Sequence, residues 1–151
     1  MEKISKKELL IWMAGFVDGE GSIGINSVGK GKTYIAKLTV CNTNKKSILL
    51  FERKFGGKTR LRKWKGIRKD NWKPCYEWCL TNKAAVNAIK QLRPYLQIKN
   101  KQADLVIELG RLKSTYDGIQ MRWDRKLRDK MWRIFAKLKE KTKKLNKRGI
   151  K

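Results

Sequence analysis

Two acidic residues stand where the first predicted helix must end, within the stretch WMAGFVDGEGS at residues 12–22. Asp18 and Glu20 are separated only by Gly19 and follow an apolar helical run. The C-terminus of a helix disfavours acids and leaves carbonyl oxygens without helical partners. Hard cations such as Mg²⁺ prefer carboxylate and carbonyl oxygens. The stretch is therefore a candidate for metal-dependent phosphodiester hydrolysis; the alternative is that both acids are ordinary turn residues.

The two glycines of this stretch predict close packing against another helix. Gly15 and Gly19 lie four residues apart, so they share one helix face on which no side chain keeps a neighbour away. One chain offers too few acids here for a site with two metal ions. A two-fold dimer through this face would bring a second Glu20 close.

The charge of the chain implies a polyanionic partner. Lys and Arg number 39 against 13 Asp and Glu, so the formal net charge is +26 in 151 residues. Such a charge repels itself without counterions, and nucleic acid is the first candidate partner and an anionic membrane surface the second. No apolar run is long enough to span a bilayer and no signal peptide opens the chain, so we expect a protein that is not secreted. The lack of histidine argues against zinc and against histidine acid–base chemistry.

The three cysteines predict reduced thiols. Cys41, Cys75 and Cys79 form an odd set, which is typical of a cytosol-like compartment. If residues 75–79 are extended, Cys75 and Cys79 lie too far apart to bind one metal ion.

Hydrophobic periodicity predicts an α+β chain in which two hairpins are each followed by a helix. The predicted helices span about residues 6–19, 45–55, 83–92, 98–112 and 120–146. The predicted strands span residues 22–28, 33–41, 58–65 and 72–81, around turns at 29–32 and 66–71. We expect one antiparallel sheet backed by helices in a single domain over residues 1–151, with its core over about 5–112.

Several helix ends carry recognisable signals. Ser5 and Glu8 form a capping box before the first helix. Residues 42–44 can cap the second helix and Asn82 the third. The tail over 139–151 is a run of charge that we expect to fray.

Each hairpin has one apolar and one polar, basic face, which is typical of a nucleic-acid platform. A two-stranded ribbon fits the DNA major groove, where Arg reads guanine and Asn reads adenine. Lysines at loop tips hold phosphates without reading sequence. A single basic run is usually a solvated face. Three such runs on the same predicted face favour DNA binding.

The stretch WMAGFVDGEGS resembles the LAGLIDADG motif of homing endonucleases. Residues 91–108, QLRPYLQIKNKQADLVIE, resemble the segment that follows the second hairpin in the same proteins. The α-ββ-α-ββ-α order matches as well, up to about residue 110. One motif copy in a short chain resembles the homodimeric branch of this family, whose members are encoded in introns. The resemblance implies an antiparallel sheet that saddles DNA and is backed by helices.

The resemblance also implies roles for five residues. Glu20 would bind the metal, where many relatives carry Asp, and Gly19 would lend its carbonyl oxygen. Lys99 would polarise the scissile phosphate or order water. Asn42 would position water, and Lys46 stands where relatives carry a basic residue. The alternatives are a plain phosphate contact for Lys99 and a helix cap for Asn42.

The remaining implied positions form two surfaces. The expected DNA-binding residues are Ser22, Asn26, Val28, Lys30, Lys32, Thr33, Ile35, Lys37, Thr39, Arg60, Arg62, Cys75, Glu77 and Lys101. The expected dimer interface comprises Trp12, Ala14, Gly15 and Asp18, with Asp18 as a support at the helix end.

Together these features predict a homodimeric, site-specific DNA endonuclease of intron homing. It would use Mg²⁺ or Mn²⁺, with Ca²⁺ as a non-catalytic substitute, and would break both strands of a long, nearly palindromic site. The expected compartment is a prokaryotic cytoplasm or an organelle, with no small-molecule substrate. The rival is a non-cleaving nucleic-acid binder or an RNA-splicing maturase on the same fold. A membrane role is disfavoured because only the last helix, with Trp123 and Trp132, gives it weak support.

Overall fold

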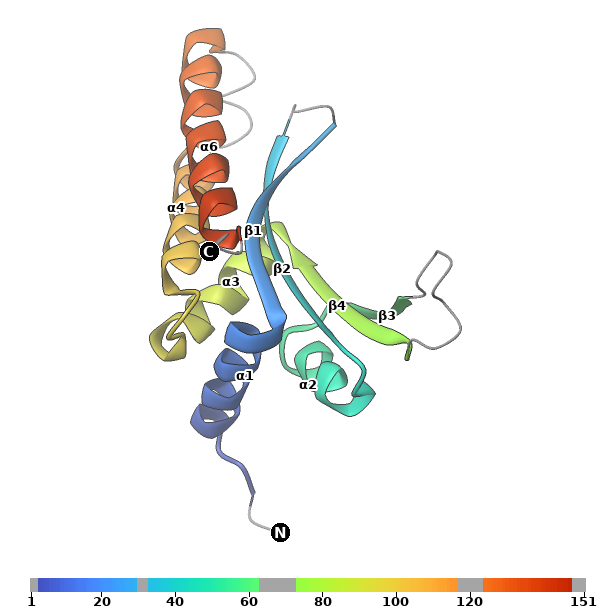
Figure 1. Ribbon diagram of the computed structural model, residues 1–151. Helices are drawn as coiled ribbons and strands as arrows, with labels where there is room; N and C mark the ends of the chain where they lie inside the picture. The colour runs from blue at the N-terminus through green and yellow to red at the C-terminus, as the bar shows by residue number, and fades with distance from the viewer. Residues whose placement is uncertain (1–2, 30–32, 63–72, 117–123, 148–151) are drawn as a thin grey trace.

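The computed structural model describes residues 3–29, 33–62, 73–116 and 124–147 (Figure 1). Within these residues, the helices and strands follow the predicted α-ββ-α-ββ-α order, and the helices α4 and α6 come after them. The elements are α1 (Lys6–Glu20), β1 (Gly21–Val28), β2 (Thr33–Asn42), α2 (Lys45–Phe55), β3 (Lys58–Arg62), β4 (Cys75–Thr81), α3 (Asn82–Leu92), the 3₁₀ turn η2 (Arg93–Tyr95), α4 (Asn100–Thr115) and α6 (Arg125–Asn146). The predicted α+β class is therefore confirmed.

The strands form one antiparallel sheet in the order β1-β2-β4-β3. Gly21 pairs with Val40, so the first residue of β1 lies beside the end of β2. Strands β2 and β4 pair in the middle of the sheet, with Thr39 opposite Cys79. The helices gather on one side of this curved sheet and leave its other side open (Figure 1).

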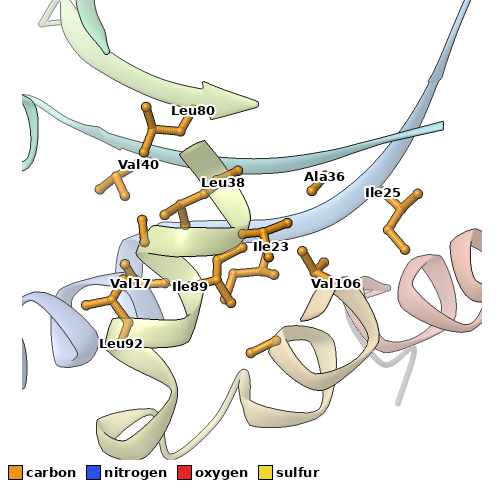
Figure 2. Close-up of a cluster of buried hydrophobic side chains, with 14 of the residues drawn as sticks. Val17, Ile23, Ile25, Ala36, Leu38, Val40, Leu80, Ile89, Leu92 and Val106 are labelled. Carbon is orange, nitrogen blue, oxygen red and sulfur yellow. The ribbon is translucent and has the colours of Figure 1, made fainter. Parts of the chain in front are cut away.

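The core lies between the sheet and the helices. Alternate strand residues, among them Ile23, Leu38 and Leu80, point toward α3 and α4 (Figure 2). Trp78 is fully buried, and its indole N–H donates to the Gly56 carbonyl oxygen at 2.7 Å. The alternation of apolar and polar residues thus assigns the faces correctly, because a strand exposes successive side chains to opposite sides.

Helix ends follow the predicted signals in two of three cases. The capping box is present, because Ser5 N–H donates to Glu8 Oε2 at 2.7 Å and Glu8 N–H donates to Ser5 Oγ at 3.2 Å. Asn44 caps α2 by accepting the Ser47 N–H at 3.1 Å. The prediction for Asn82 is wrong: it is the first residue of α3, with φ at 57°, and Thr81 precedes it without a side-chain cap.

The prediction that the tail over residues 139–151 frays is wrong for residues 139–146, and residues 148–151 lie outside the described residues. Helix α6 continues to Asn146, whose amide nitrogen donates to the Ile23 carbonyl oxygen at 2.9 Å. Thr142 is only 1% exposed, and Met131 and Phe135 join the core. The charge run obscured the apolar residues that recur at helical spacing within it. Some predictions lie wholly or partly outside the described residues. These are the turns at 29–32 and 66–71, the strand residues 63–65 and the role of Trp123.

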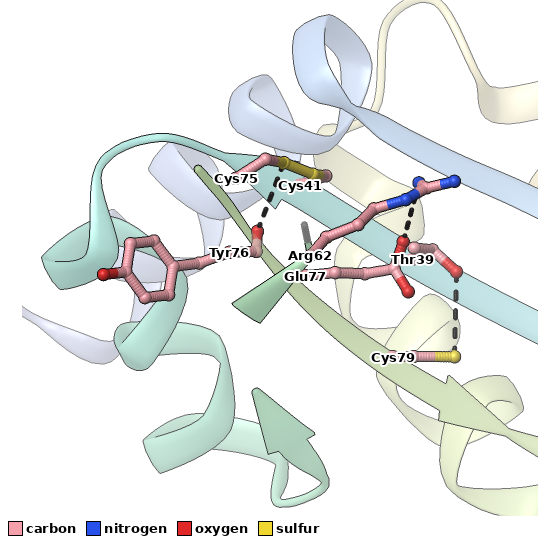
Figure 3. Close-up of polar contacts among 7 residues, drawn as sticks. All are labelled: Thr39, Cys41, Arg62, Cys75, Tyr76, Glu77 and Cys79. Carbon is pink, nitrogen blue, oxygen red and sulfur yellow. Dashed lines mark hydrogen bonds and ion pairs between the residues drawn. A yellow bond between two sulfur atoms is a disulfide. The ribbon is translucent and has the colours of Figure 1, made fainter. Parts of the chain in front are cut away.

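The prediction of reduced thiols is wrong for two of the three cysteines. Cys41 and Cys75 form a disulfide, with their Cα atoms 6.3 Å apart, and Cys79 is free. Cys41 lies opposite Glu77 in the β2–β4 pairing, so Cys75 is its diagonal neighbour on the same face (Figure 3). The bond depends on the adjacency of two strands that are separated by α2 in the sequence.

No helix within the described ranges has both the length and the apolar character that crossing a bilayer requires.

Replacing Gly21 with Ala is expected to destabilise the fold by about 1–3 kcal/mol, because a Cβ there would overpack against α1. That carbon would lie 2.9 Å from both Cα and the carbonyl oxygen of Val17. Gly24→Ala is the matched control, since its Cβ would meet only the Asn146 amide at 3.6 Å. Denaturant unfolding of both variants measures the difference; equal losses would contradict the close approach.

Candidate nucleic-acid interface and metal site

The end of α1 presents a carboxylate and carbonyl oxygens on exposed backbone. Glu20 is the last residue of the helix, and both Glu20 and Gly19 are exposed. Gly21 follows at once and donates its N–H to the Val17 carbonyl oxygen. Because β1 begins at Gly21 with no intervening loop, the sheet fixes the position of Glu20.

Asp18 has a different task from Glu20. Its carboxylate accepts hydrogen bonds from the backbone N–H groups of Gln97 at 2.8 Å, Ile98 at 3.2 Å and Lys99 at 2.9 Å. Asp18 is only 9% exposed. Both carboxylate oxygens are thus used within the chain. We assign Asp18 a supporting role at the helix end rather than a contact with a partner.

Lys99 completes a reciprocal connection between the same two segments. Its ammonium group donates to the carbonyl oxygens of Asp18 at 2.6 Å and Val17 at 3.1 Å. Burial lowers the pKa of Lys99, while the carboxylates of Asp18 and Glu20 oppose this shift. The ammonium therefore offsets the negative end of α1 and stands in the electrostatic field of Glu20.

Asn42 lies at the same end of the sheet as Glu20. The pairing of Gly21 with Val40 places the residue before β1 near the last residues of β2 (Figure 1). Asn42 Oδ1 accepts the Asn44 N–H at 2.8 Å, which makes a turn before α2. Its amide nitrogen makes no hydrogen bond within the described part of the chain. Lys46, in the first turn of α2, is exposed.

The donor atoms at this end suit a hard cation but are few. Across the described ranges, no group of three or more His, Cys, Asp or Glu side chains could hold a metal ion. Glu20 supplies one carboxylate and Gly19 a carbonyl, which are the ligand types that Mg²⁺ accepts. Within the described residues, the end of α1 therefore offers one carboxylate and one carbonyl oxygen as possible ligands.

The open face of the sheet carries most of the predicted DNA-binding residues. The register aligns Ser22 with Thr39, and Arg60 with Glu77, so their side chains share one face. Most of these side chains are exposed or half-buried. Exposed are Ser22, Asn26, Val28, Thr33, Arg60 and Arg62, and half-buried are Ile35, Lys37, Thr39 and Glu77.

Hydrogen bonds join side chains on this face across neighbouring strands (Figure 3). Arg62 Nη1 donates to Glu77 Oε2 at 3.1 Å, between β3 and β4. The Thr39 hydroxyl donates to Cys79 Sγ at 3.7 Å, between β2 and β4. Lys58 lies opposite Cys79 on the same face and is exposed. Lys58 was not among the predicted DNA-binding residues. Its spacing of two residues from Arg60 could have placed it on the same face.

The other four predicted DNA-binding residues are not part of this set. Cys75 lies on the same face, opposite Arg62, but it is 8% exposed and its sulfur is bonded to Cys41. Lys101 is exposed in the first turn of α4 rather than on the sheet. Lys30 and Lys32 lie outside the described residues.

The outer face of α1 is open and partly apolar. A Cβ at Gly15 or Gly19 would meet no atom within 4 Å. Trp12 is 41% exposed and Ile11 is 46% exposed beside them. Ala14, which was expected at this surface, is fully buried and belongs to the core. Two exposed apolar residues were not anticipated, namely Ile11 on α1 and Ile98 at 69% exposure, whose N–H donates to Asp18.

Comparison with solved structures identifies the fold. The homing endonuclease I-CvuI in complex with its target matches with a TM-score of 0.62 and 24% identity, over 94% of this chain and 84% of that one. The archaeal intron-encoded homing endonuclease I-Vdi141I, complexed with DNA, matches with a TM-score of 0.68 and 13% identity, over 97% and 89%. The LAGLIDADG homing endonuclease I-GzeII matches with a TM-score of 0.61 and 20% identity, over 93% of this chain and 44% of that one.

The chain therefore has the fold of the LAGLIDADG homing endonucleases. The resemblance predicted from its motif is confirmed by this likeness in structure. No protein-family model and no curated protein matches the sequence.

Replacing Asp18 with Asn is expected to lower the free energy of unfolding by at least about 2 kcal/mol, because three backbone donors lose a charged acceptor. Asp104→Asn is the matched control, since its side chain is 57% exposed in a surface ion pair with Arg93. Such a pair contributes at most about 1 kcal/mol. Denaturant unfolding compares the two, and equal effects would show that Asp18 does not hold the two segments together.

Proposed function

We propose that this protein is a homodimeric DNA endonuclease that cuts both strands of a specific site with the help of a divalent metal ion. The observation that carries the proposal is the exposed carboxylate of Glu20 at the end of an α1 face that is itself open to a second chain. The proteins of the same fold include homing endonucleases solved with DNA. I-CvuI was solved with DNA in the presence of Ca in one structure and of Mg in another.

The sheet would supply recognition. Its open face offers Asn26, Arg60 and Lys37 from three strands, within a curved surface that is free of helices (Figure 1). Arg and Asn side chains can each form two hydrogen bonds with one purine edge in the major groove. The excess of positive charge would hold the phosphates and steer the encounter.

Dimerisation would complete the cleavage site. The small residues Gly15 and Gly19 leave the backbone of α1 accessible, and Trp12 and Ile11 supply apolar area beside them. A two-fold axis through this face would relate α1 to the same helix of the second chain. It would place both Glu20 carboxylates near the axis, between the two recognition surfaces. One helix face would thereby set the spacing of the two sheets on DNA.

Each residue at the end of α1 would have a distinct role. Glu20, with the carbonyl oxygen of Gly19, would hold the metal ion. A bound divalent ion supplies a more acidic water and stabilises negative charge on the phosphate. The free amide nitrogen of Asn42 would orient a water molecule, and Lys99 would place positive charge beside the reacting phosphate. Lys46 would contact the DNA backbone from the first turn of α2.

A Glu20→Gln variant is expected to bind its DNA site but to cut it at least about 10²-fold more slowly, because the neutral amide is a poor ligand for a hard cation. DNA carrying the uninterrupted insertion site is the substrate, with EDTA as the metal-free control. Cleavage rates and binding are measured on the same duplex. Undiminished cutting by the variant would refute the assignment of Glu20, whereas binding without nicking by the unaltered chain in Mg²⁺ would favour a non-cleaving binder.

Replacing Gly15 with Leu is expected to prevent dimerisation while the chain stays folded. A Cβ at Gly15 would meet no atom of the same chain within 4 Å, and Leu favours helix over Gly by about 0.8 kcal/mol. Sedimentation should show a dimer for the unaltered chain and a monomer for the variant, which should also lose double-strand cleavage. Lys90→Leu places the same side chain on the exposed face of α3 as a control. A Gly15→Leu variant that still dimerises would exclude this interface.

A further inference from the structure

The outer face of α6 carries a row of positive charge that the proposed cleavage site does not use. We name it the basic stripe, and it consists of Lys126, Lys130, Arg133, Lys137, Lys141 and Lys144. All six residues are exposed. Successive members lie three or four residues apart, so they share one helix face. The row extends over about 27 Å at 1.5 Å per residue.

The basic stripe is not required for packing. The buried residues of α6 are Met131, Phe135, Leu138 and Thr142, on another side of the helix. Its polar contacts with β1 come from Lys139 and Asn146, which are not part of the stripe. Within the described ranges, no residue of the stripe forms a hydrogen bond or an ion pair. The two acids of α6, Asp129 and Glu140, are exposed beside the stripe and likewise lack an ion pair there.

The stripe lies apart from the open face of the sheet. Lys139 Nζ donates to Ser27 Oγ at 2.8 Å, and Ser27 lies on the same face of β1 as Ile23 and Ile25, which point to the core. Helix α6 therefore packs on the core side of β1 and runs along it (Figure 1). A straight duplex on the open face would lie on the other side of β1 and would not reach the stripe.

The chemistry of the stripe fits a phosphate backbone. It has regularly spaced cations but no exposed aromatic ring on which unpaired bases would stack; Trp132 is half-buried and packs edge-on against Tyr34, with ring centroids 6.2 Å apart. The buried apolar residues of α6 pack in the core and Leu145 is its one exposed large apolar residue among those described, so the helix has no continuous apolar face to insert into a membrane. Cations on a rigid rod can follow the phosphates of a duplex without reading its sequence.

We propose that the basic stripe binds the phosphate backbone of a second segment of double-stranded DNA, separate from the segment on the sheet. The proposal rests on the proposed function only in placing the first segment there. One molecule would then hold two duplex segments together. Holding the second segment raises its effective concentration near the open face of the sheet, which favours transfer from one segment to another.

A bridging assay tests this proposal without cleavage. The protein is bound in EDTA to an immobilised duplex of random sequence, and capture of a second, fluorescent random duplex is measured. The stripe variant combines Lys130→Gln, Arg133→Gln, Lys137→Gln and Lys141→Gln. It should stay on the immobilised duplex through the sheet but capture at least tenfold less of the second one. The slope of the logarithm of the capture affinity against the logarithm of salt concentration should become less negative by about 0.9 for each phosphate that the variant no longer neutralises.

A variant with the same change in charge serves as the control. Lys6→Gln, Lys7→Gln, Lys83→Gln and Lys90→Gln remove four exposed cations from α1 and α3, and capture should persist. Circular dichroism checks that both variants are folded. The proposal is overturned if the stripe variant still captures the second duplex, or if both variants lose capture equally.

A sheet variant separates this outcome from a failure of the proposed function. Lys37→Gln with Arg60→Gln should weaken binding of the immobilised duplex at the sheet and leave the stripe as the remaining surface. If adding Lys37→Gln and Arg60→Gln to the stripe variant does not weaken its binding to the immobilised duplex, the sheet is not a DNA surface and the proposed function fails. Capture by the stripe variant is measured independently of that result.

Discussion

The site depends on one reciprocal set of hydrogen bonds between the end of α1 and the start of α4. Asp18 accepts three backbone N–H groups from residues 97–99, and the Lys99 ammonium donates to the carbonyl oxygens of Val17 and Asp18 in the last turn of α1. Each segment thereby supplies hydrogen-bond partners to backbone groups of the other. Helix ends carry backbone groups without intrahelical partners by necessity. The hydrogen bonds join residues 79–82 positions apart in the chain, and they turn two helix ends into one rigid corner.

This corner determines what each acid can do. Asp18 is committed inside the chain, so Glu20 is the acid that remains exposed at the end of the helix. Gly21 cannot accept a side chain because Val17 lies too close, so β1 leaves the corner directly. The proposed metal-binding end of α1 and the proposed recognition surface are thus parts of one continuous backbone. A shift in how two α1 helices pack would move Glu20 and the sheet together.

Local patterns in the sequence were sufficient to predict most of the elements and the two faces of the sheet. The capping box at Ser5 and the alternation of Ile23, Ile25 and Leu38 needed only neighbours in the chain. The role of Asp18 as a helix-end support was also foreseen, but its partners were not, because residues 97–99 are remote in sequence. Likewise the Cys41–Cys75 disulfide requires β2 and β4 to be neighbours, and alternation does not specify strand order.

The distribution of charge explains why nucleic acid is the partner that the structure favours. The ion pairs within the described ranges are Arg62–Glu77, Arg93–Asp104 and Arg111–Glu108, and all involve exposed side chains. Exposed pairs stabilise a fold little, and pairing within the chain leaves the net charge at +26, because that value already counts every acid. Repulsion among these cations opposes the folded state. Phosphates on the open face of the sheet would relieve that repulsion where β1, β2 and β3 meet the ligand, and phosphates along α6 would relieve it where the helix is densest in lysine. Bound DNA would therefore stabilise the folded state, because its phosphates reduce the repulsion among the cations.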